Sequence, residues 1–338
     1  MFTTNQICAA PVKLCVARIR NRACGIVVNS GNANACTGKQ GMKDALQMAT
    51  FTEQALALPE GSMLVASTGR IGLNMPMDNV RAGILDAAVQ LSEKRESAGH
   101  AAEAIMTSDT IPKEIAVKLN IGGKQVRIGG ICKGAGMIHP GMSPTGKRPA
   151  SLPLHATMLG FITTEANIAT KTLQRCLTEA VAQSFNRITV DGDMSTTDTV
   201  LVMANGQAGN PKLQSPNSHL EQFQHALNHV CLEMAKMLVR DGEGVSRFVT
   251  VRVDGARSIK EADAAARAVA NSELVKTSWL GGDPNWGRII DALGYSTAKI
   301  VEEKIDIGYS KPGSKRITWS LKGGQPTRVT VEKLCGAV

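Results

Sequence analysis

The sequence predicts an α+β protein with two domains, or with one large domain and a smaller one attached. At 338 residues the chain is long for one simple core. Apolar residues recur at helical spacing in several windows, and short apolar or alternating runs, which are typical of strands, lie between these windows. Helices are therefore predicted over 41–58, 76–93, 98–106, 167–185, 217–240 and 258–271.

The predicted strands are bounded by glycine-rich or polar turns. Residues 24–37 indicate a buried strand that runs into a turn of small residues, and residues 62–72 a short strand that ends in a glycine-containing turn. From Lys113 we predict a β-hairpin that turns at Gly-Gly and leads into a glycine-rich loop. Further predictions are strand, acidic turn and strand over 186–206, an exposed loop over 143–155, an alternating strand over 248–255, and strands and turns over 298–338.

Composition and charge favour a globular protein without a nucleic-acid partner. Hydrophobic residues make up 43% and charged residues 20% of the chain, which is ordinary for a globular protein. The formal charge of +9 comes from basic residues that are scattered and form no block, and aromatic residues are only 3% of the chain. Base-stacking platforms need aromatic residues, so a basic nucleic-acid-binding module is only a distant alternative.

The cysteines and the apolar runs bear on the cellular compartment. Eight cysteines are present and none forms a C-x-x-C pair, so we expect a reducing compartment without a disulfide framework. No apolar run approaches the roughly 18 residues that span a membrane. The first residues, "MFTTNQICAAPVKLC", lack the charged and apolar regions of a signal peptide. A cytoplasmic location is therefore expected.

Three short patterns resemble phosphate or metal sites, and none is adopted. Residues 141–148, "GMSPTGKR", approach the P-loop pattern but carry Arg148 where a hydroxyl would hold magnesium. His225 and His229 share one face of a predicted helix, with no carboxylate ligand beside them. Asp191 and Asp193 in "DGD" fit an ordinary turn as well as a cation site. No metal is predicted.

The stretch "LHATMLGFITT" (154–164) raises the question of what Thr157 does. A β-branched residue at the start of an apolar run is typical of a strand, and from these residues alone that interpretation is favoured. The alternative is a nucleophile. A threonine hydroxyl needs an adjacent base, and the threonine's own α-amine can serve if the preceding peptide bond, here after Ala156, is cut.

Other polar residues could complete such a site. Thr68 and Gly69 offer hydrogen-bond donors on the polar turn after a predicted strand. Lys133 offers a cation in "CKGAG", and Glu243 a carboxylate in "GEG". Each taken singly is more simply a loop or surface residue. Spacing alone does not establish that they meet.

Nine stretches together resemble a known family, ornithine acetyltransferase, also called bifunctional glutamate N-acetyltransferase, of arginine biosynthesis. They occur in the family's order within residues 2–289 and are "FTTN" with "AAPV", "NSGNAN", "STGRIG", "IMTSDT", "KGAGMIHP", "ATMLGF", "TVDGDMSTTDT", "GEGVSRF" and "DPNWGRI". The resemblance implies a precursor that cleaves itself between Ala156 and Thr157. It also implies a layered αββα core, formed by an α chain of residues 1–156 and by residues 157–244 of the β chain, and a smaller C-terminal domain from 245 to 338.

The implied reaction is acetyl transfer from N-acetylornithine to glutamate through an acyl-enzyme on Thr157. Acetyl-CoA serves some members as a donor, no cofactor is expected, and the cleaved chains are expected to form an α₂β₂ assembly. By motif position, Thr68 and Gly69 would form the oxyanion hole. Thr107, Lys133, Thr157 and Glu243 would contact the substrate, since a lysine suits a carboxylate and a glutamate suits an amine.

The sequence departs from the family pattern in three places. Residues 143–155 separate "HPGM" from "ATML", which are continuous in the family. The chain also begins at the "FTTN" stretch and stops at "KLCGAV", so we expect it to be truncated at both ends and to lack a C-terminal segment that helps bind substrate. Two alternatives therefore remain: an inactive truncated fragment, or a related threonine-nucleophile hydrolase that passes the acyl group to water.

Overall fold

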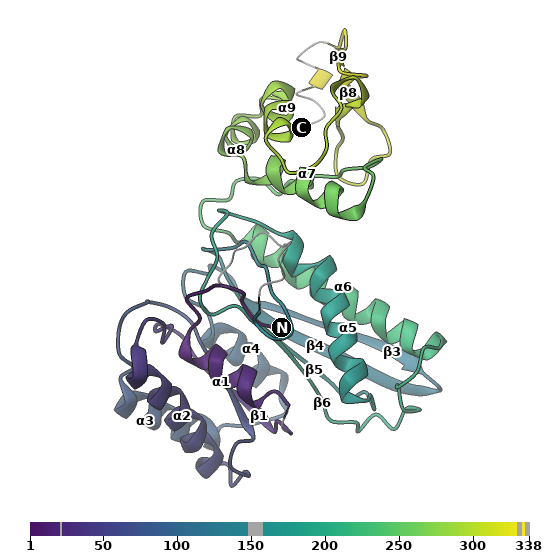
Figure 1. Ribbon diagram of the computed structural model, residues 1–338. Coiled ribbons are helices and arrows are strands. Elements are labelled where there is room, and N and C mark those ends of the chain that lie inside the picture. Colours follow the sequence, from purple (N-terminus) through teal and green to yellow (C-terminus); the bar gives the residue numbers. More distant parts are fainter. Residues whose placement is uncertain (21, 148–157, 330–332, 335–338) are drawn as a thin grey trace. The chain divides into compact units, whose positions relative to one another are not determined.

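The computed structural model in Figure 1 describes the whole chain except residues 21, 148–157, 330–332 and 335–338. The chain forms two compact units, Met1–Val245 and Ser246–Val338, which we call the larger unit and the C-terminal unit. Both contain helices and strands, which confirms a mixed α and β protein. The predicted division between residues 156 and 157 lies outside the described residues and stays a prediction.

A four-stranded mixed sheet forms the centre of the larger unit. Its order is β3 (Lys113–Ile121), β4 (Lys124–Lys133), β5 (Leu159–Thr164) and β6 (Thr199–Ala204). The first two pairs are antiparallel and the last is parallel. The predicted hairpin is confirmed, and it turns at Gly122 and Gly123, which both have positive φ, as a tight two-residue hairpin requires.

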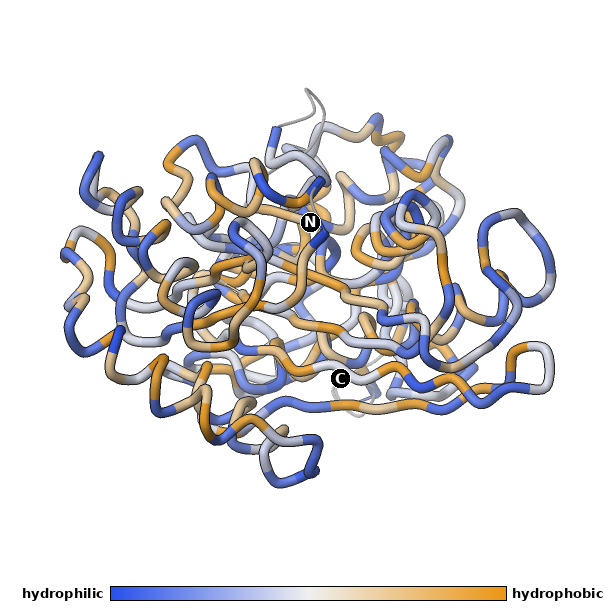
Figure 2. Tube along the Cα trace, turned by 90° about the horizontal axis from the view of Figure 1, so that it is seen from below, coloured by the Kyte–Doolittle hydropathy of each residue, from blue (hydrophilic) through white to orange (hydrophobic). Residues whose placement is uncertain are grey.

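Two helices cover one face of this sheet, as Figure 1 shows: α5 (Thr170–Gln183) and α6 (Ser218–Arg240). The long helix predicted over 217–240 is confirmed. It begins after Asn217, whose side chain accepts a hydrogen bond from the Leu220 N–H. Its apolar stripe, with Phe223 and Leu227, packs with Ile128 and Ile162 of the strands in one buried cluster. In Figure 2 hydrophobic residues, in orange, recur along the central segments of the tube, while many outer loops are blue and therefore hydrophilic.

The opposite face of the sheet packs against a second, smaller sheet. This is the parallel pair β1 (Gly25–Asn29) and β2 (Met63–Ser67). Leu64 and Ala66 of β2 share a cluster with Leu159 and Phe161 of β5. The alternate β2 side chains, such as Val65, point to the other side, where they pack with residues of helices α1 (Ala10–Arg18), α2 (Gly38–Ala55) and α3 (Met77–Val89). The next helix, α4 (Arg95–Ala104), leads toward β3.

One predicted strand of the larger unit does not form. Residues 188–190 follow a 3₁₀ turn, η1 (Phe185–Arg187), and pair with no strand among the described residues. Val190 instead donates one backbone hydrogen bond to the Ile138 carbonyl over 2.7 Å, and the Ile138 N–H donates to the side chain of Asp191 over 2.9 Å. The β-branched residues of this segment therefore tie an extended loop to another loop, and the prediction of a strand before the acidic turn is wrong.

The C-terminal unit contains helices α7 (Ile259–Asn271), α8 (Glu273–Leu280) and α9 (Trp286–Gly294), the 3₁₀ turn η2 (Glu302–Lys304), and a small sheet of β7 (Ile307–Tyr309), β8 (Thr318–Lys322) and β9 (Gln325–Pro326). The predicted helix over 258–271 and the strands of the tail are confirmed. The strand predicted over 248–255 is wrong: the segment is mostly exposed and takes part in no ladder among the described residues. Alternation without a hydrogen-bonded neighbour does not make a strand.

Candidate functional site

The polar residues singled out in the sequence lie where several elements of the larger unit end. Thr68 and Gly69 follow β2, Lys133 ends β4, and Glu243 comes shortly after α6. Thr107 lies in the loop between α4 and β3. Strand ends and loops on a rigid scaffold are common places for binding and catalytic groups.

The turn after β2 is held by the loop after its neighbour β1. The Thr68 N–H donates to the Asn29 carbonyl over 3.1 Å, and the Arg70 N–H donates to the Gly31 carbonyl over 3.2 Å. Gly69, with φ of +129°, lies so close to that loop that a Cβ would be 2.2 Å from the Gly31 carbonyl carbon. Only glycine fits this position.

This turn presents two potential donors. The Thr68 residue is fully buried, and its hydroxyl lies beside Lys133. Within the part of the chain that the structure describes, no hydrogen bond engages the Gly69 N–H. A free backbone N–H beside a threonine hydroxyl is a suitable arrangement for stabilising an oxyanion.

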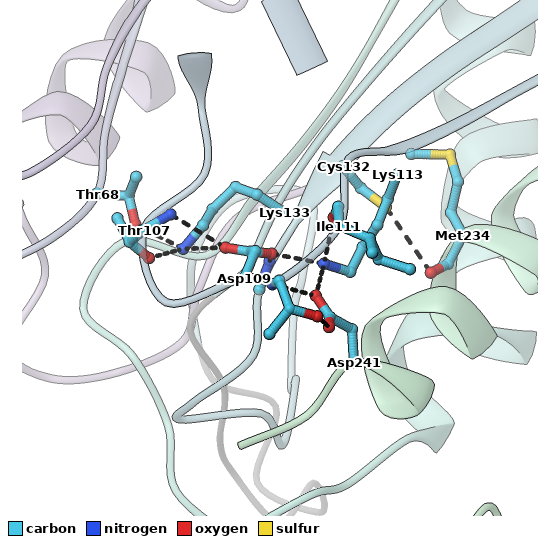
Figure 3. A network of polar contacts seen from close by, with 11 residues as sticks. Thr68, Thr107, Asp109, Ile111, Lys113, Cys132, Lys133, Met234 and Asp241 are labelled. Carbon is cyan, nitrogen blue, oxygen red and sulfur yellow. Dashed lines mark hydrogen bonds and ion pairs between the residues drawn. The ribbon is translucent and has the colours of Figure 1, made fainter. Parts of the chain in front are cut away.

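Lys133 joins the two threonines, as Figure 3 shows. Its Nζ donates to the Thr107 Oγ1 over 2.6 Å and to the Thr68 Oγ1 over 3.3 Å. An Asp109 carboxylate oxygen lies 3.5 Å from the same nitrogen, and both side chains are buried. The fold thus brings three of the residues predicted from the sequence into direct contact, although Thr68 and Lys133 are 65 positions apart in the chain.

Asp109 is the residue that fixes this cluster. Its Oδ1 accepts from the Gly134 N–H over 2.6 Å, and its Oδ2 accepts from the Thr107 N–H over 3.1 Å. Burial alone would raise the pKa of Asp109, but the charge of Lys133, a hydrogen bond from Lys113 and these two N–H groups hold the pKa below its ordinary value. Asp109 is therefore an ionised carboxylate at neutral pH.

A second buried lysine continues the network toward α6. Lys113 Nζ lies 2.7 Å from Asp109 Oδ1 and 2.5 Å from Asp241 Oδ2. Asp241 also accepts hydrogen bonds from the backbone and the hydroxyl of Thr110. The two lysines and the two aspartates balance in charge, which lowers the cost of burying them.

Glu243 is placed by the loop that follows Lys133. Its N–H donates to the Ala135 carbonyl over 2.8 Å, and its carboxylate lies over Gly136, where an added Cβ would be 2.7 Å from Oε1. The residue is exposed. Glu243 therefore lies on the loop that follows Lys133, and its exposed carboxylate is open to a ligand's positive charge.

The predicted nucleophile and cleavage bond, Thr157 and Ala156, lie outside the described residues. The chain is described again from Met158, whose N–H donates to Asp198 Oδ1 over 2.6 Å. The next residue, Leu159, pairs with Lys133 across β4 and β5. The strand that follows the predicted nucleophile therefore starts beside the lysine of the site.

Asp198 is a buried carboxyl group with an unusual environment. Burial raises its pKa well above the ordinary value, against the opposing effects of the Met158 N–H and the charge of Lys133. Its Oδ2 is buried and makes no hydrogen bond with any described residue. Such a group is a candidate for a role in the site.

The sequence reasoning missed Asp109, Lys113, Asp198 and Asp241 as members of the site. Asp109 and Asp198 lie inside stretches that carry the family resemblance, "IMTSDT" and "TVDGDMSTTDT", so a signal was present. The sequence carried no signal for Lys113 or Asp241, because Lys113 lies in an ordinary strand pattern and Asp241 lies at the end of a helix. Their importance comes from contacts across more than 120 positions of sequence.

The other patterns weighed in the sequence do not form metal centres in the described residues. There, no group of three or more His, Cys, Asp or Glu side chains is arranged to hold a metal ion. His225 and His229 lie on the exposed side of α6. Asp191 accepts the N–H groups of Ile138 and Asp193, which is a structural role in a turn. Among the described helices, none combines the length and hydropathy that a membrane crossing requires.

Comparison with known proteins gives a consistent result. The model of the ArgJ family matches residues 1–334. The arginine biosynthesis bifunctional protein ArgJ of Symbiobacterium thermophilum is 49% identical over 308 residues, which are 91% of this chain and 73% of that protein. A glutamate N-acetyltransferase of Methanocaldococcus jannaschii is 47% identical over 90% of this chain and 72% of its own length. The predicted resemblance is confirmed, and the fragment and hydrolase alternatives are not favoured.

Two solved structures are also similar. The crystal structure of arginine biosynthesis bifunctional protein ArgJ from Bacillus halodurans is 41% identical and covers 52% of this chain and 78% of its own, with a TM-score of 0.48. The ornithine acetyltransferase of Mycobacterium tuberculosis, solved in complex with ornithine, is 35% identical and covers 42% of this chain and 75% of its own, with a TM-score of 0.39.

Proposed function

Because the chain belongs to the ArgJ family, we propose that it is a glutamate N-acetyltransferase of arginine biosynthesis that moves an acetyl group from N-acetylornithine to glutamate. The observation that carries the site assignment is the contact of Lys133 with both Thr68 and Thr107, directly beside the start of β5. Acetyl-CoA is an alternative acetyl donor, and no resident cofactor or metal takes part in the proposal.

The first proposed step is self-cleavage, in which one water molecule hydrolyses the peptide bond between Ala156 and Thr157, leaves a carboxylate on Ala156 and frees the α-amine of Thr157. That amine then removes the proton of the Thr157 hydroxyl, whose oxygen attacks the acetyl carbonyl carbon of N-acetylornithine. The amide C–N bond breaks, ornithine leaves with the proton on its amine, and an acetyl ester remains on the threonine. The α-amine of glutamate attacks this ester, the C–O bond breaks, and N-acetylglutamate leaves while the hydroxyl is restored.

The described residues supply the surroundings of this chemistry. Each tetrahedral intermediate places a negative charge on the former carbonyl oxygen, and the Thr68 hydroxyl with the Gly69 N–H would donate to it. We assign the exposed carboxylate of Glu243 to the free amine of the ornithine part, because an ion pair between these opposite charges would orient the substrate. Thr107 and Lys133 complete the proposed substrate contacts.

The proposal also covers the architecture and the assembly. The packing of β1 and β2 between helices and the larger sheet supports a layered αββα core of the threonine N-terminal nucleophile type. After cleavage, the α chain 1–156 and the β chain from 157 would form an α₂β₂ assembly in the cytoplasm. The mass of the native particle, measured by light scattering after size exclusion, tests the assembly.

Intact-mass spectrometry beside acetyl-transfer assays tests the function. The wild type is expected to give two chains split before Thr157 and to form N-acetylglutamate only when both substrates are present. The Thr157→Ala variant should stay whole and inactive, while Thr157→Ser, which keeps a hydroxyl, should retain slow cleavage. Acetate released from N-acetylornithine at an equal rate without glutamate would instead indicate a hydrolase.

A substitution at Glu243 tests the orientation of the substrate. Glu243→Gln is expected to raise the KM for N-acetylornithine about 10-fold, because the amide cannot pair with an ammonium group. Glu233→Gln, which removes another carboxylate of the same unit from an α6 surface pair with Lys236, is the matched control and should leave the KM unchanged. An unchanged KM in the Glu243 variant would remove this residue from the proposed site.

A further inference from the structure

The charged network behind Lys133 extends well beyond the residues that the proposed reaction uses. Asp109, Lys113 and Asp241 are buried, whereas Glu243 is exposed. Figure 3 shows them in one line, from the two threonines through Lys133 and Asp109 to Lys113 and Asp241 at the end of α6. Burying four charges is costly unless every one of them is paired, so a network of this extent needs a reason.

The donors and acceptors around Lys133 indicate what the network does. An ammonium group has three N–H donors and no acceptor. Three oxygens lie within reach of the Nζ atom, those of Thr107 at 2.6 Å, Thr68 at 3.3 Å and Asp109 at 3.5 Å. The two threonine oxygens accept hydrogen bonds and the Asp109 oxygen is an ion-pair partner, so these three groups hold the ammonium in place within the protein.

Because an ammonium group can donate but not accept hydrogen bonds, its contact with Thr68 also fixes the role of the Thr68 hydroxyl. Since Lys133 can only donate, the oxygen of Thr68 must accept, and the hydroxyl proton of Thr68 is then directed to another acceptor. A hydroxyl that accepts from a cation is also polarised, which makes it a stronger donor. The position next to Gly69 N–H is where the proposed oxyanion would develop.

We propose that Asp109 is a positioning residue of the oxyanion turn: backed by Lys113 and Asp241, it holds the Lys133 ammonium against Thr68, so that the Thr68 hydroxyl donates to the oxyanion. In this arrangement Lys133 acts mainly on Thr68, and only secondarily on the substrate. The inference rests on the proposed function for the identity of the oxyanion, but the charge network itself is independent of it.

The geometry of Asp109 is suited to this task. Gly134 and Thr107 fix it through backbone N–H groups at 2.6 Å and 3.1 Å, and Lys113 fixes it through a third contact at 2.7 Å. Asp241 holds Lys113 from the other side, so that Lys113 is not left as an unpaired cation. The carboxylate therefore cannot turn away from Lys133 without breaking several hydrogen bonds.

The Asp109 carboxylate also helps to keep Lys133 protonated. The charged groups that face it are Asp109, Lys113 and Asp198. Burial lowers the pKa of Lys133, and the Asp109 carboxylate opposes that shift most strongly. Without this carboxylate, the lysine would lose its proton at a lower pH. A neutral amine could accept the Thr68 proton and so remove the donor from the oxyanion.

The test is the Asp109→Asn variant, which keeps the shape and removes the charge. Because loss of a whole oxyanion donor costs roughly 10²–10³-fold in kcat, we expect kcat for N-acetylornithine and glutamate to fall about 10–100-fold, normalised to the cleaved fraction of the enzyme. The KM should change less than about 3-fold, and the alkaline limb of the kcat profile should move to lower pH. Asp241→Asn should give a smaller effect in the same direction, and Glu233→Gln none.

The inference would be overturned if Asp109→Asn changed KM and not kcat. A large rise in KM with kcat preserved would make Lys133 an anchor for substrate carboxylate. If Asp109→Asn does not fold, a double-mutant cycle of Thr68→Val and Lys133→Met replaces it. Strongly non-additive losses of kcat are expected if the lysine acts through the threonine, and additive losses would contradict the inference.

A measurement without turnover separates this inference from the proposed function. Lysine labelled with ¹³C at Cε is titrated by NMR, and the Lys133 signal is identified from its absence in Lys133→Arg. The pKa of Lys133 should be lower in Asp109→Asn than in the wild type, even if the wild type transfers no acetyl group. An unchanged pKa would refute the network's role, whereas an inactive wild type with the expected shift would refute only the proposed reaction.

Discussion

In the larger unit, Lys113 and Asp241 lie 2.5 Å apart with side chains only 1% and 5% exposed, whereas in the C-terminal unit Arg252 and Asp254 lie 2.8 Å apart with side chains 82% and 71% exposed. The distances are similar and the surroundings are opposite. A buried pair that loses one partner leaves an uncompensated charge, while an exposed pair returns to water. The comparison teaches that ion pairs of nearly equal length can differ several-fold in their effect on stability.

The strongest test of this comparison is removal of the carboxylate between the two buried lysines. Asp109→Ala should lower the free energy of unfolding by about 3–5 kcal/mol, because the two buried lysines are then left with Asp241 as the one remaining aspartate of the network and Lys133 loses its ion-pair partner. Urea unfolding followed by circular dichroism measures the change. Glu233→Ala, at the α6 surface, is the matched control with little expected effect. A loss below about 1 kcal/mol for Asp109→Ala would mean that the network tolerates an unpaired cation.

The turn that carries Thr68 allows a test of how backbone conformation and steric contact, and not charge, affect stability. Gly69→Ala places a Cβ 2.2 Å from the Gly31 carbonyl carbon at a φ of +129°, and should cost more than about 2 kcal/mol. Gly72→Ala shares the positive φ, +85°, but has open space around its Cβ, and should cost about 1 kcal/mol. Thermal unfolding compares the two. Equal losses would show that φ, and not the contact with the β1 loop, decides the effect.

Asp198 allows a test of a buried carboxyl group to which no described cationic side chain donates a hydrogen bond. Its folded-state pKa is raised above the unfolded value, so its favourable contribution is present below about pH 4 and is lost as pH rises through the folded pKa. Asp198→Asn carries no charge and keeps an acceptor for the Met158 N–H. The stability of the variant relative to the wild type should therefore increase from pH 4 to pH 8. A difference that stays constant over this range would contradict the raised pKa.

The smallest effect is expected at the exposed pair of the C-terminal unit. Arg252→Ala should change stability by about 0.5 kcal/mol or less, because water and salt screen charges that are mostly exposed. Unfolding at low and at high salt measures the remaining interaction. A loss comparable to that of Asp109→Ala would remove the distinction between the two units.

The sequence predicted local structure well where a periodic pattern agreed with the surroundings. The long amphipathic helix over 217–240 and the hairpin that turns at Gly-Gly were both predicted, and the structure has them as Ser218–Arg240 and as the turn at Gly122 and Gly123. The predictions failed where a strand pattern had no neighbour. Residues 188–190 and 248–255 have β-branched or alternating residues, but ladder hydrogen bonds come from a second strand that the pattern itself does not provide.

The residues of the site also fall into those that the sequence predicted and those that it did not. Thr68, Gly69, Thr107, Lys133 and Glu243 were predicted, with the help of motifs that resemble a known family, and the structure groups Thr68, Thr107 and Lys133 through direct contacts. Lys113 and Asp241 could not be predicted. They are 128 positions apart, and each is an ordinary residue in its own segment.

By itself, the sequence determined the family, the mixed α and β class and the residue types available for acyl transfer, because these follow from motifs, periodicity and side-chain chemistry. Only the tertiary structure decided that Lys133 is surrounded by three acceptors, that Gly69 lies against Gly31, and that Asp241 balances Lys113. The physical reason is that charge pairing and steric contact depend on distance in space. Distances between segments are set by how the two sheets and their helices pack, and no single segment encodes them.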